Sequence, residues 1–444
     1  MDMGKKIIIA GGGHGGIAAG ALLAKEGFDV TVYEKNKRED MGYDWTDIFD
    51  RKALFAIGLD MPPEDKYLLK NDMAFYNPSL TTVLKQHVPE EELEIQMERR
   101  EIYNMLISYA EENGVKFEYE TPVKAPVMLG SRIVGVELEK GVEYADLVID
   151  SAGINSPLRT QLPDYLGIQN EVKEFEQFYV YRGFFNKPAP SKDEKFRVFL
   201  FFDNKAQICW VADDGEYTDV LIGRFAPITM DDVNDTLIKL RDKNPDLGTE
   251  LIRGGQFVNI PVRQPLGVMV ADGYAAIGDS AFMTVPVIGS GIANCLKAAK
   301  ILADTVIADK NGLYDAETLW KYQRGYYKKL GNGLAPVASI KLMLTRLTCP
   351  ELDYIFENEI LNADDMTIGA DANNILAFVK DMADFDSLKK KFSGISKNPV
   401  VFKKVARMAG EIAKVTAATS SMPVSYNRKL VCAWAKRYNA CFKH

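Results

Sequence analysis

The chain has 444 residues, of which 47% are hydrophobic, and a formal net charge of −8. This composition is ordinary for a globular protein with a large core and two or three domains. No run of about 18 apolar residues and no signal-peptide pattern occurs, which excludes a membrane-spanning helix and leads us to expect a cytoplasmic protein. The five cysteines are scattered, so we expect neither a disulfide framework nor a metal site, and any electrons must travel on an organic cofactor.

The first predicted elements form a βαβ unit over Lys6–Asn36. The run Ile7–Ile9 is too short for a helix and predicts a buried parallel strand. The Ala- and Leu-rich segment Ile17–Lys25 predicts a helix, and Val30–Tyr33 predicts a second strand. Three glycines in GxGxxG spacing join the first strand to the helix: Gly11, Gly13 and Gly16.

This glycine spacing is typical of a dinucleotide-binding turn. The first glycine permits the tight turn, the second lets backbone N–H groups approach a pyrophosphate, and the third lets helix and strand pack closely. Glu34 follows the second strand, 18 residues after Gly16, where a carboxylate can accept hydrogen bonds from an adenosine ribose. We interpret His14, which lies among the glycines, as an exposed turn residue without a metal or catalytic role.

The first domain continues to about residue 170. Tyr43–Asp47 holds two aromatic and two acidic side chains in a segment that is neither a linker nor a simple crossover. Met73–Tyr76 and Thr82–Leu84 predict a strand pair, and Met97–Asn113 has the apolar spacing of an amphipathic helix. A further strand, Ala145–Asp150, leads into a Ser-Ala-Gly turn.

The middle of the chain predicts a second domain of a different kind, over residues 171–254. Thr229 is the expected N-cap of a helix over Met230–Lys243. Four segments with alternating aromatics predict an inserted antiparallel sheet that binds substrate: Phe175–Phe185, Lys195–Asp203, Gln207–Ala212 and Asp219–Phe225. We therefore place the first domain at residues 1–170 and 255–310, and a helical region at residues 311–444.

A second site signal lies in Gly278–Asp304. A strand delivers Asp279 at its carboxyl end, Pro286 stiffens the following loop, and Gly289 and Gly291 open a new helix. The unpaired N–H groups of such a helix start favour negative charge. A reduced flavin carries this charge at one ring edge, and Asp279 is placed to bond the ribityl hydroxyls.

These motifs together resemble flavoproteins of the para-hydroxybenzoate hydroxylase fold, and more closely the geranylgeranyl reductase family. The resemblance rests on GxGxxG, on Glu34, on Arg100, on Gly278-Asp279-Ser280, and on Pro286 followed by Gly289-Ser290-Gly291-Ile292. It implies an α/β fold of mixed α+β character: an FAD-binding Rossmann-like domain, an inserted antiparallel β domain that binds substrate, and a C-terminal helical region. It also implies a set of FAD contacts: Gly11, Gly13, Gly15, Gly16, Glu34, Lys35, Arg100, Val123, Asp279, Pro286, Gly289, Gly291 and Ile292.

The chain departs from these relatives at three places. Where the family has a redox-relevant Cys-Gly pair, this sequence has Gly42-Tyr43-Asp44-Trp45, which argues against a cysteine-dependent mechanism. The lipid-binding Tyr-x-Trp-x-Phe-Pro motif corresponds to Ile208–Asp213 and retains only Trp210. The Asp-Gly turn that helps hydroxylases hold NADPH has Ala152 at the acidic position, which disfavours docking of NADPH there.

The residues expected to act on the substrate follow from these departures. Tyr43, Asp44 and Asp47 are candidate proton donors for a reduction, although a solvated or helix-capping cluster is an equal alternative. Three further residues are candidate substrate contacts, with structural pairing or core packing as the alternatives: Trp45, Trp210 and Arg263.

We therefore expect an FAD-dependent oxidoreductase that reduces, or in reverse forms, a carbon–carbon double bond in a hydrophobic, isoprenoid or lipid-like substrate. The alternatives are a class A type flavin monooxygenase and a non-catalytic electron-transfer flavoprotein. The electron donor is NAD(P)H or an acidic carrier such as a ferredoxin or flavodoxin.

The C-terminal part of the chain is strongly basic. Residues 388–444 hold thirteen Lys or Arg and one acid, Glu411. An apolar stripe at helical spacing accompanies this charge: Val401, Phe402, Val405, Met408 and Ile412. The region is expected to contact an anionic membrane surface or an acidic electron carrier, or else simply to cover the acidic domain. No recognised nucleic-acid fold accompanies the charge, so no nucleic-acid partner is expected.

Overall fold

The computed structural model describes residues 4–70, 72–191, 194–363, 365 and 394–442. Its first unit is a six-stranded sheet, parallel except for its last pair, β18 and β19. In spatial order the strands are β18 (Val270–Ala271), β19 (Tyr274–Ala276), β12 (Leu147–Asp150), β1 (Lys6–Ala10), β2 (Asp29–Tyr33) and β8 (Lys116–Glu118).

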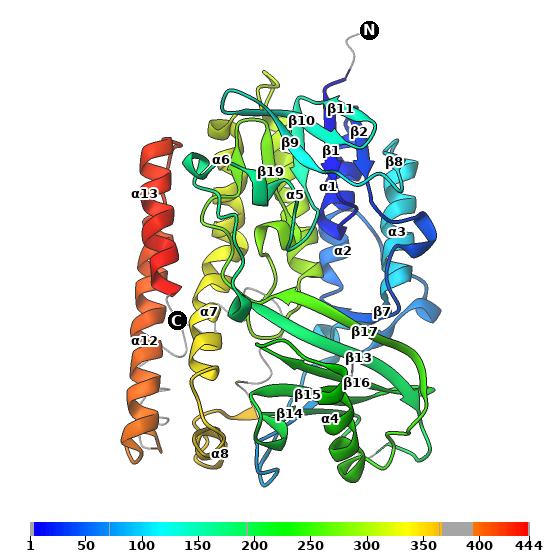
Figure 1. Cartoon of the computed structure of the whole chain (residues 1–444), viewed down its shortest axis with the longest axis vertical. Coiled ribbons are helices and arrows are strands. Elements are labelled where there is room, and N and C mark those ends of the chain that lie inside the picture. The colour runs from blue at the N-terminus through cyan, green and yellow to red at the C-terminus, as the bar shows by residue number, and fades with distance from the viewer. Residues whose placement is uncertain (1–3, 71, 192–193, 364, 366–393, 443–444) are drawn as a thin grey trace.

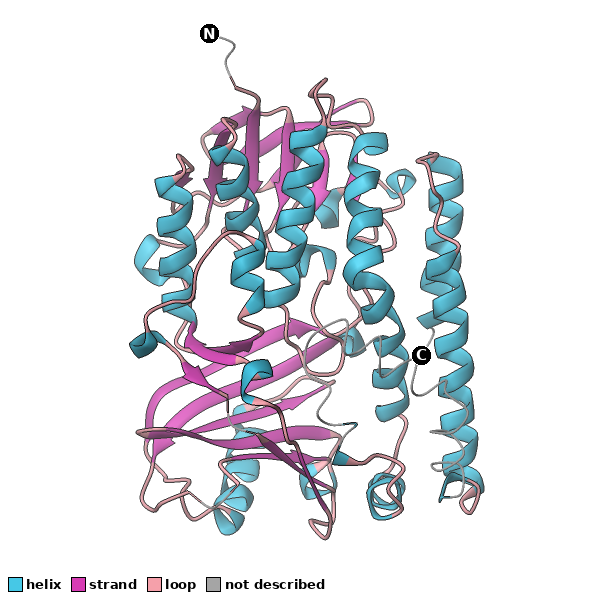
Figure 2. Ribbon diagram, turned by 180° about the vertical axis from the view of Figure 1, so that it is seen from behind, coloured by secondary structure: helices cyan, strands magenta, loops and turns pink. Residues whose placement is uncertain are grey.

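Both faces of this sheet are covered. Ile7, Ile8 and Ile9 are fully buried because helices pack on one face of β1 and a small sheet packs on the other. Figure 2 shows the row of helices: α1 (His14–Lys25), α3 (Arg99–Glu112) and α5 (Ile292–Ala308). The small antiparallel sheet comprises β9 (Ala125–Leu129), β10 (Arg132–Leu138) and β11 (Gly141–Tyr144). The predicted βαβ unit is confirmed.

A seven-stranded sheet forms the second unit, below the first in Figure 1. In spatial order its strands are β17 (Leu251–Pro261), β13 (Gln177–Asn186), β16 (Tyr217–Arg224), β15 (Gln207–Asp214), β14 (Phe196–Leu200), β5 (Met73–Tyr76) and β6 (Val83–Lys85). The pairings are antiparallel except for β14 with β5. Two of these strands, β5 and β6, thus come from the N-terminal part of the chain.

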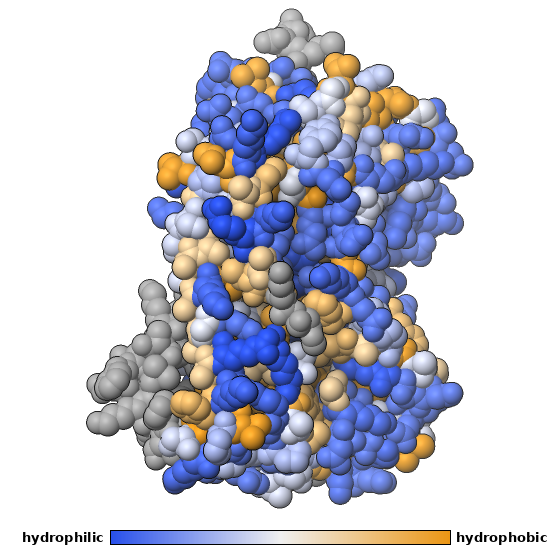
Figure 3. Space-filling view, turned by 60° about the vertical axis from the view of Figure 1, so that its left-hand side comes forward, coloured by the Kyte–Doolittle hydropathy of each residue, from blue (hydrophilic) through white to orange (hydrophobic). Residues whose placement is uncertain are grey.

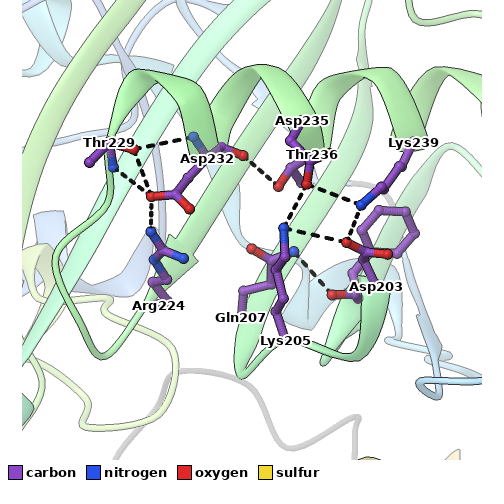
Figure 4. Close-up of polar contacts among 10 residues, drawn as sticks. Asp203, Lys205, Gln207, Arg224, Thr229, Asp232, Asp235, Thr236 and Lys239 are labelled. Atoms are coloured by element: carbon purple, nitrogen blue, oxygen red, sulfur yellow. Dashed lines mark hydrogen bonds and ion pairs between the residues drawn. The ribbon is translucent and has the colours of Figure 1, made fainter.

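Helix α4 (Met230–Lys243) packs on this sheet and is held by polar contacts at its start and along its length (Figure 4). The Thr229 side chain caps it by accepting a hydrogen bond from Asp232 N, as the sequence predicts. Asp232 also pairs with Arg224 of β16. Lys239 pairs with Asp203 at 2.5 Å, which ties the middle of the helix to the turn before β15.

A third, small sheet lies between the two large ones and joins them. Its strands are β3 (Thr46–Phe49), β7 (Ile95–Glu98) and β4 (Leu68–Leu69), with β7 in the centre. The short helix α2 (Lys52–Ala56) follows β3. Arg253 of β17 bonds both Asp44 and Glu98 at 2.6 Å, so this junction is also fixed by charge.

Helices complete the chain. They are α6 (Ala316–Tyr326), a π-helical turn (Tyr327–Gly331), α7 (Asn332–Leu344), α8 (Cys349–Glu357), α12 (Pro399–Ser420) and α13 (Arg428–Asn439). Figure 1 shows α12 and α13 stacked along one edge of the molecule, beside α6 and α7. The predicted helical region also includes residues 366–393 and 443–444, which lie outside the described residues.

The apolar stripe of α12 faces the protein and not the solvent. Val401 and Met408 are buried in one cluster with side chains of α7 and α8, and Val405 and Ile412 pack against that cluster. Phe402 is 38% exposed. Of the alternatives for this stripe, the described residues therefore show the covering one, because α12 packs it against α7 and α8.

Candidate functional site

One cavity of about 820 Å³ joins the two large sheets. Its upper end lies at the carboxyl ends of β1 and β2, where α/β sheets bind ligands. Its lower part is bounded by the seven-stranded sheet and by α7 and α12. The volume is at the upper end of the range for small-molecule and cofactor sites, about 300–1,000 Å³.

The glycine turn forms one wall at the upper end. Gly11 has a φ of +83°, a conformation that glycine adopts without strain. A Cβ on Gly13 would lie 2.5 Å from Ser151 Oγ, and one on Gly16 would lie 2.5 Å from Ser151 Cβ. Gly11, Gly13 and Gly15 line the cavity, whereas Gly16 packs behind it against β12.

Glu34 lies across from this turn and lines the cavity with Lys35 and Val123. Its carboxylate accepts hydrogen bonds from Gly12 N at 2.7 Å and from Asn36 N at 2.8 Å. Because a carboxylate can accept about four hydrogen bonds, Glu34 orders the turn and keeps capacity for a ribose.

A second helix start lines the same cavity. Helix α5 begins after Gly291, and neither it nor α1 has a side-chain cap. Gly289, Gly291 and Ile292 line the cavity beside Asp279, whereas Pro286 is buried behind the loop. Thr284 Oγ1 donates a hydrogen bond to Asp279 at 3.0 Å, and burial raises the pKa of this carboxyl.

Asp150 links the two halves of the cofactor site, a role that the sequence gives no sign of. Its carboxylate accepts hydrogen bonds from Ser280 Oγ at 2.9 Å and from Tyr274 at 2.8 Å. Ser280 Oγ in turn accepts one from Gly153 N at 2.9 Å. The carboxyl ends of β12 and β19 therefore hold each other in place.

These residues fit FAD. Two uncapped helix starts offer unpaired N–H groups to a diphosphate and to an anionic ring edge. Glu34 and Asp279 both line the cavity, where they would meet the ribose and the hydroxyls of a ribityl chain if FAD were bound. Cβ atoms at Gly13 and Gly16 would enter the space of Ser151, which explains why this turn needs glycine.

Arg99, not Arg100, lines the cavity. Its guanidinium makes two hydrogen bonds to Asp47, of 2.7 and 3.0 Å. Arg100, the next residue of α3, is exposed. The predicted FAD contact at Arg100 is thus one residue away from Arg99, the side chain that reaches the cavity.

The environment of Asp47 and Arg99 fixes their charge. Despite burial, Arg99 lowers the pKa of Asp47, and Asp47 raises that of Arg99. His14 lies beside them and stacks on Tyr103 at 4.3 Å between ring centroids. Burial lowers the pKa of His14 to about 3, so it is a neutral, cavity-lining side chain and not the exposed turn residue that we expected.

The three candidate proton donors are separated by the structure. Tyr43 lines the cavity, and burial raises its pKa to about 12. Asp47 is ion-paired with Arg99. Asp44 does not line the cavity and instead bonds Arg253 and Gly254 N. Of the three, Tyr43 alone is a cavity-lining side chain that carries a proton at neutral pH.

The two candidate tryptophans lie in the lower, apolar part of the cavity. Both Trp45 and Trp210 line it. Between them lies Arg182, with its guanidinium carbon 5.0 Å from the Trp45 ring and 5.1 Å from the Trp210 ring. Arg182 is 2% exposed and pairs with Asp219 at 2.6 Å. Arg182 was not among the residues predicted for the site, although it is the one charged residue in the aromatic run of β13.

Arg263 lies outside the cavity and forms a structural ion pair, which was the alternative to its candidate role as a substrate contact. It is 1% exposed, pairs with Glu176 at 3.3 Å, and stacks on Phe282 at 4.5 Å. Arg159 stacks on the same ring at 4.6 Å. Phe282 directly follows the turn Gly278–Ala281 that carries Asp279, so these two arginines pack against that turn on the side away from the cavity.

The remaining lower wall is formed by apolar side chains from the seven-stranded sheet and from α7 and α12. Members of this wall include Phe75, Val198, Leu200, Ile208, Leu221, Val258, Ile260, Val337, Ile340, Met343, Leu344 and Met408. Cys295 also lines the cavity, and Cys209 is buried nearby in the sheet. Burial raises the pKa of both thiols, so both are neutral and unreactive.

Comparisons with known proteins agree with this architecture. Residues 9–58 match the model of an NAD(P)-binding Rossmann-like domain, and residues 260–355 match that of squalene epoxidase. A digeranylgeranylglycerophospholipid reductase of Sulfolobus acidocaldarius is 23% identical, and the match covers 89% of each chain. A second reductase of that name, from Haloferax volcanii, is 24% identical over 86% of this chain and 95% of the relative.

A solved structure shows the same fold. It is a geranylgeranyl bacteriochlorophyll reductase-like protein of Thermoplasma acidophilum, 17% identical, with a TM-score of 0.70. The match covers 88% of this chain and 99% of that one.

Proposed function

We propose that this chain, which belongs to the geranylgeranyl reductase family of FAD-dependent oxidoreductases, reduces a carbon–carbon double bond in a hydrophobic isoprenoid. One observation carries the proposal. The cavity that begins at the dinucleotide turn continues, without a break, into a chamber walled by apolar side chains. A long hydrocarbon can therefore reach the cofactor from that chamber.

Bound FAD supplies the hydride for such a reduction. The chain itself has to hold the substrate, exclude water and donate a proton. The apolar wall around Trp45 and Trp210 performs the first two tasks. The Tyr43 hydroxyl donates the proton, because it lines the cavity and its pKa of about 12 keeps it protonated at neutral pH. Arg99 lies 4.4 Å over the Tyr43 ring and stabilises negative charge there after the proton leaves.

A test follows from the anaerobic reaction. Purified holoprotein is reduced with dithionite and mixed with geranylgeraniol without oxygen, and flavin absorbance is followed. We expect reoxidation of the flavin together with a product that has gained two hydrogens, identified by mass spectrometry. A saturated long-chain alcohol is the matched control and should cause no reoxidation.

The same protein distinguishes the competing functions. If oxygen is required and the product has gained an oxygen atom, the chain is a monooxygenase and the proposal fails. If no small acceptor reoxidises the flavin but a redox protein does, the chain is an electron-transfer protein. Parallel reduction by NADH, NADPH and reduced ferredoxin identifies the electron donor.

The basic edge of the molecule supports a partner proposal as well. Helices α12 and α13 carry eight Lys or Arg and one acid, Glu411. Lys403, Arg407 and Lys414 are exposed on α12. Figure 3 brings this side forward and shows a largely hydrophilic surface with small hydrophobic patches. No helix among the described residues is long and apolar enough to cross a bilayer. We propose that this edge contacts anionic lipid head groups, from which an isoprenoid enters.

Vesicle flotation tests this contact. Phosphatidylcholine vesicles with phosphatidylglycerol should bind the protein, in a salt-dependent way, and pure phosphatidylcholine should not. Replacing Lys403, Arg407 and Lys414 by Gln should abolish binding. Gln at the exposed Lys25, Lys52 and Lys140, which lie elsewhere, is the matched control. The alternative outcome is that the unmodified protein does not bind vesicles and that reduced ferredoxin reduces its flavin but not that of the Lys403/Arg407/Lys414 variant. In that case the edge binds an acidic electron carrier instead.

A further inference from the structure

An ion pair between Lys70 and Glu94 lines the lower cavity and has no part in the mechanism above. Lys70 Nζ lies 2.8 Å from Glu94 Oε2, and the two side chains are only 10% and 13% exposed. Lys70 follows β4, Glu94 precedes β7, and Lys70 N donates to the Glu94 carbonyl at 2.9 Å. Ile48 and Met73 line the cavity from neighbouring strands.

This pair keeps hydrogen-bonding capacity that the described residues do not use. An ammonium group carries three N–H donors, and the one hydrogen bond of Lys70 Nζ in the described structure goes to Glu94. Glu94 Oε1 accepts none from the described residues. Two charges removed from water are costly unless their remaining donors and acceptors find partners. A ligand group that can both accept and donate a hydrogen bond would complete the pair.

The charges around the cavity indicate what kind of group this is. The other buried cations that line it are already paired, Arg99 with Asp47 and Arg182 with Asp219. Lys35 is exposed and lies at the nucleotide end, beside Glu34. A phosphate in the lower cavity would thus meet no unpaired cation among the described lining residues, and Glu94 would repel it.

We propose that Lys70 and Glu94 bind a hydroxyl group of the substrate, and that the cavity therefore takes a neutral isoprenoid alcohol in preference to its phosphate ester. The hydroxyl oxygen accepts a hydrogen bond from Lys70 Nζ, and the hydroxyl group donates a hydrogen bond to Glu94 Oε1. The inference rests on the proposed function, since it names the substrate class of the same site. The ion pair would then be the polar group that fixes the orientation of the ligand in an otherwise apolar chamber.

The test compares three probes that share one hydrocarbon chain: geranylgeraniol, its methyl ether and its monophosphate. Binding to the oxidised holoprotein is followed by quenching of tryptophan fluorescence, since Trp45 and Trp210 line the cavity. The ether can accept a hydrogen bond but cannot donate one to Glu94. We expect the alcohol to bind about tenfold more tightly than the ether, the value of one hydrogen bond to a charged group. The phosphate should bind more weakly than the alcohol.

Variants locate the preference. The double substitution Lys70→Met with Glu94→Leu should abolish the preference, so that the alcohol and the ether bind with equal affinity. The matched control is Lys187→Met with Asp213→Leu, a pair of 2.7 Å that is 19% and 14% exposed and does not line the cavity. It should keep the preference. Glu94→Gln, which retains the shape of the side chain, should reduce the preference and serves if the double variant does not fold.

Two groups of outcomes overturn different claims. Equal affinities for alcohol and ether in the unmodified protein, tightest binding of the phosphate, or equal effects of the two double variants would refute the hydroxyl site alone. If no probe binds and none reoxidises the reduced flavin, the proposed reduction of isoprenoids fails as well. Reoxidation by both alcohol and ether with equal affinity leaves the reductase standing and removes the hydroxyl site.

Discussion

Replacing Arg99 by Met should destabilise the protein by about 3 kcal/mol, because it leaves the Asp47 carboxylate in a nearly buried place without its cation. The pair makes two hydrogen bonds, of 2.7 and 3.0 Å, and its side chains are 18% and 13% exposed. Arg100→Met is the matched control, since that neighbour is exposed and should change stability by less than about 0.5 kcal/mol.

The loss should depend on pH in a defined direction. In the unmodified protein Arg99 holds the pKa of Asp47 below its usual value, so the stabilisation is complete at neutral pH and is lost only in strong acid. Without Arg99, burial dominates and raises the pKa of Asp47 above its unfolded value. The folded variant then binds a proton more readily than the unfolded chain, so its deficit should shrink as pH falls from neutral toward the raised pKa.

Urea unfolding of the holoprotein, followed by tryptophan fluorescence at several pH values, measures both effects. We expect the Arg99→Met midpoint to fall most at neutral pH and to approach the unmodified midpoint in mild acid. Adding Asp47→Asn to Arg99→Met should recover part of the loss at neutral pH, because no buried charge remains. A pH-independent loss, or an equal loss in Arg100→Met, would refute the reasoning.

Three further outcomes are expected. Gly13→Ala brings a Cβ within 2.5 Å of Ser151 Oγ and should yield protein without flavin absorbance, whereas Gly410→Ala, with open space around its Cβ, should keep the flavin. Tyr43→Phe should slow anaerobic reoxidation by the isoprenoid about 100-fold in stopped flow, with the dissociation constant for the substrate unchanged. Burial lowers the pKa of Lys341 from 10.5 to about 8, so the unfolded chain binds more protons between these values and stability should rise with pH there; Lys341→Met should flatten that rise in urea midpoints.

The cofactor half of the site could be predicted because its geometry depends on local rules. Gly11 needs a positive φ, and Gly13 and Gly16 need the absence of a Cβ, constraints that leave a visible spacing in the sequence. Glu34 directly follows β2, and Asp279 lies three residues after β19, so both were expected at the same edge of the sheet. Both line the cavity.

Side-chain direction was harder to predict than position. Arg99 and Arg100 are adjacent, but successive helix residues point about 100° apart, and the start of α3 at Arg99 decides which of them faces the cavity. The sequence alone does not fix that start to one residue. The spacing of the apolar residues on α12 likewise predicted a helix correctly. Which way these residues face depends on α7 and α8, against which they pack and which come from an earlier part of the chain.

Pairing over long distances accounts for the other differences. Arg263 could have held a ligand, but folding brings Glu176 to 3.3 Å from it. Arg182 stands in a strand covered on both faces, where alternation gives no sign of a partner, and its acid, Asp219, belongs to the neighbouring strand. Lys70 and Glu94 are separated by a whole hairpin of the second sheet. None of these partners can be read from the local sequence.

The hydroxyl site and the cofactor site together fix which double bond reacts. If Lys70 and Glu94 hold the alcohol, the reacting carbon lies at a fixed distance from the hydroxyl along the hydrocarbon. The reason is that residues of β-sheets line both ends of the cavity and keep their separation constant. Geraniol, farnesol and geranylgeraniol should then first be reduced at the same double bond, counted from the hydroxyl. An apolar chamber that gripped the far end of the hydrocarbon would instead shift that position with chain length. Mass spectra of the first products distinguish the two, and in the Lys70→Met/Glu94→Leu variant the position should become mixed.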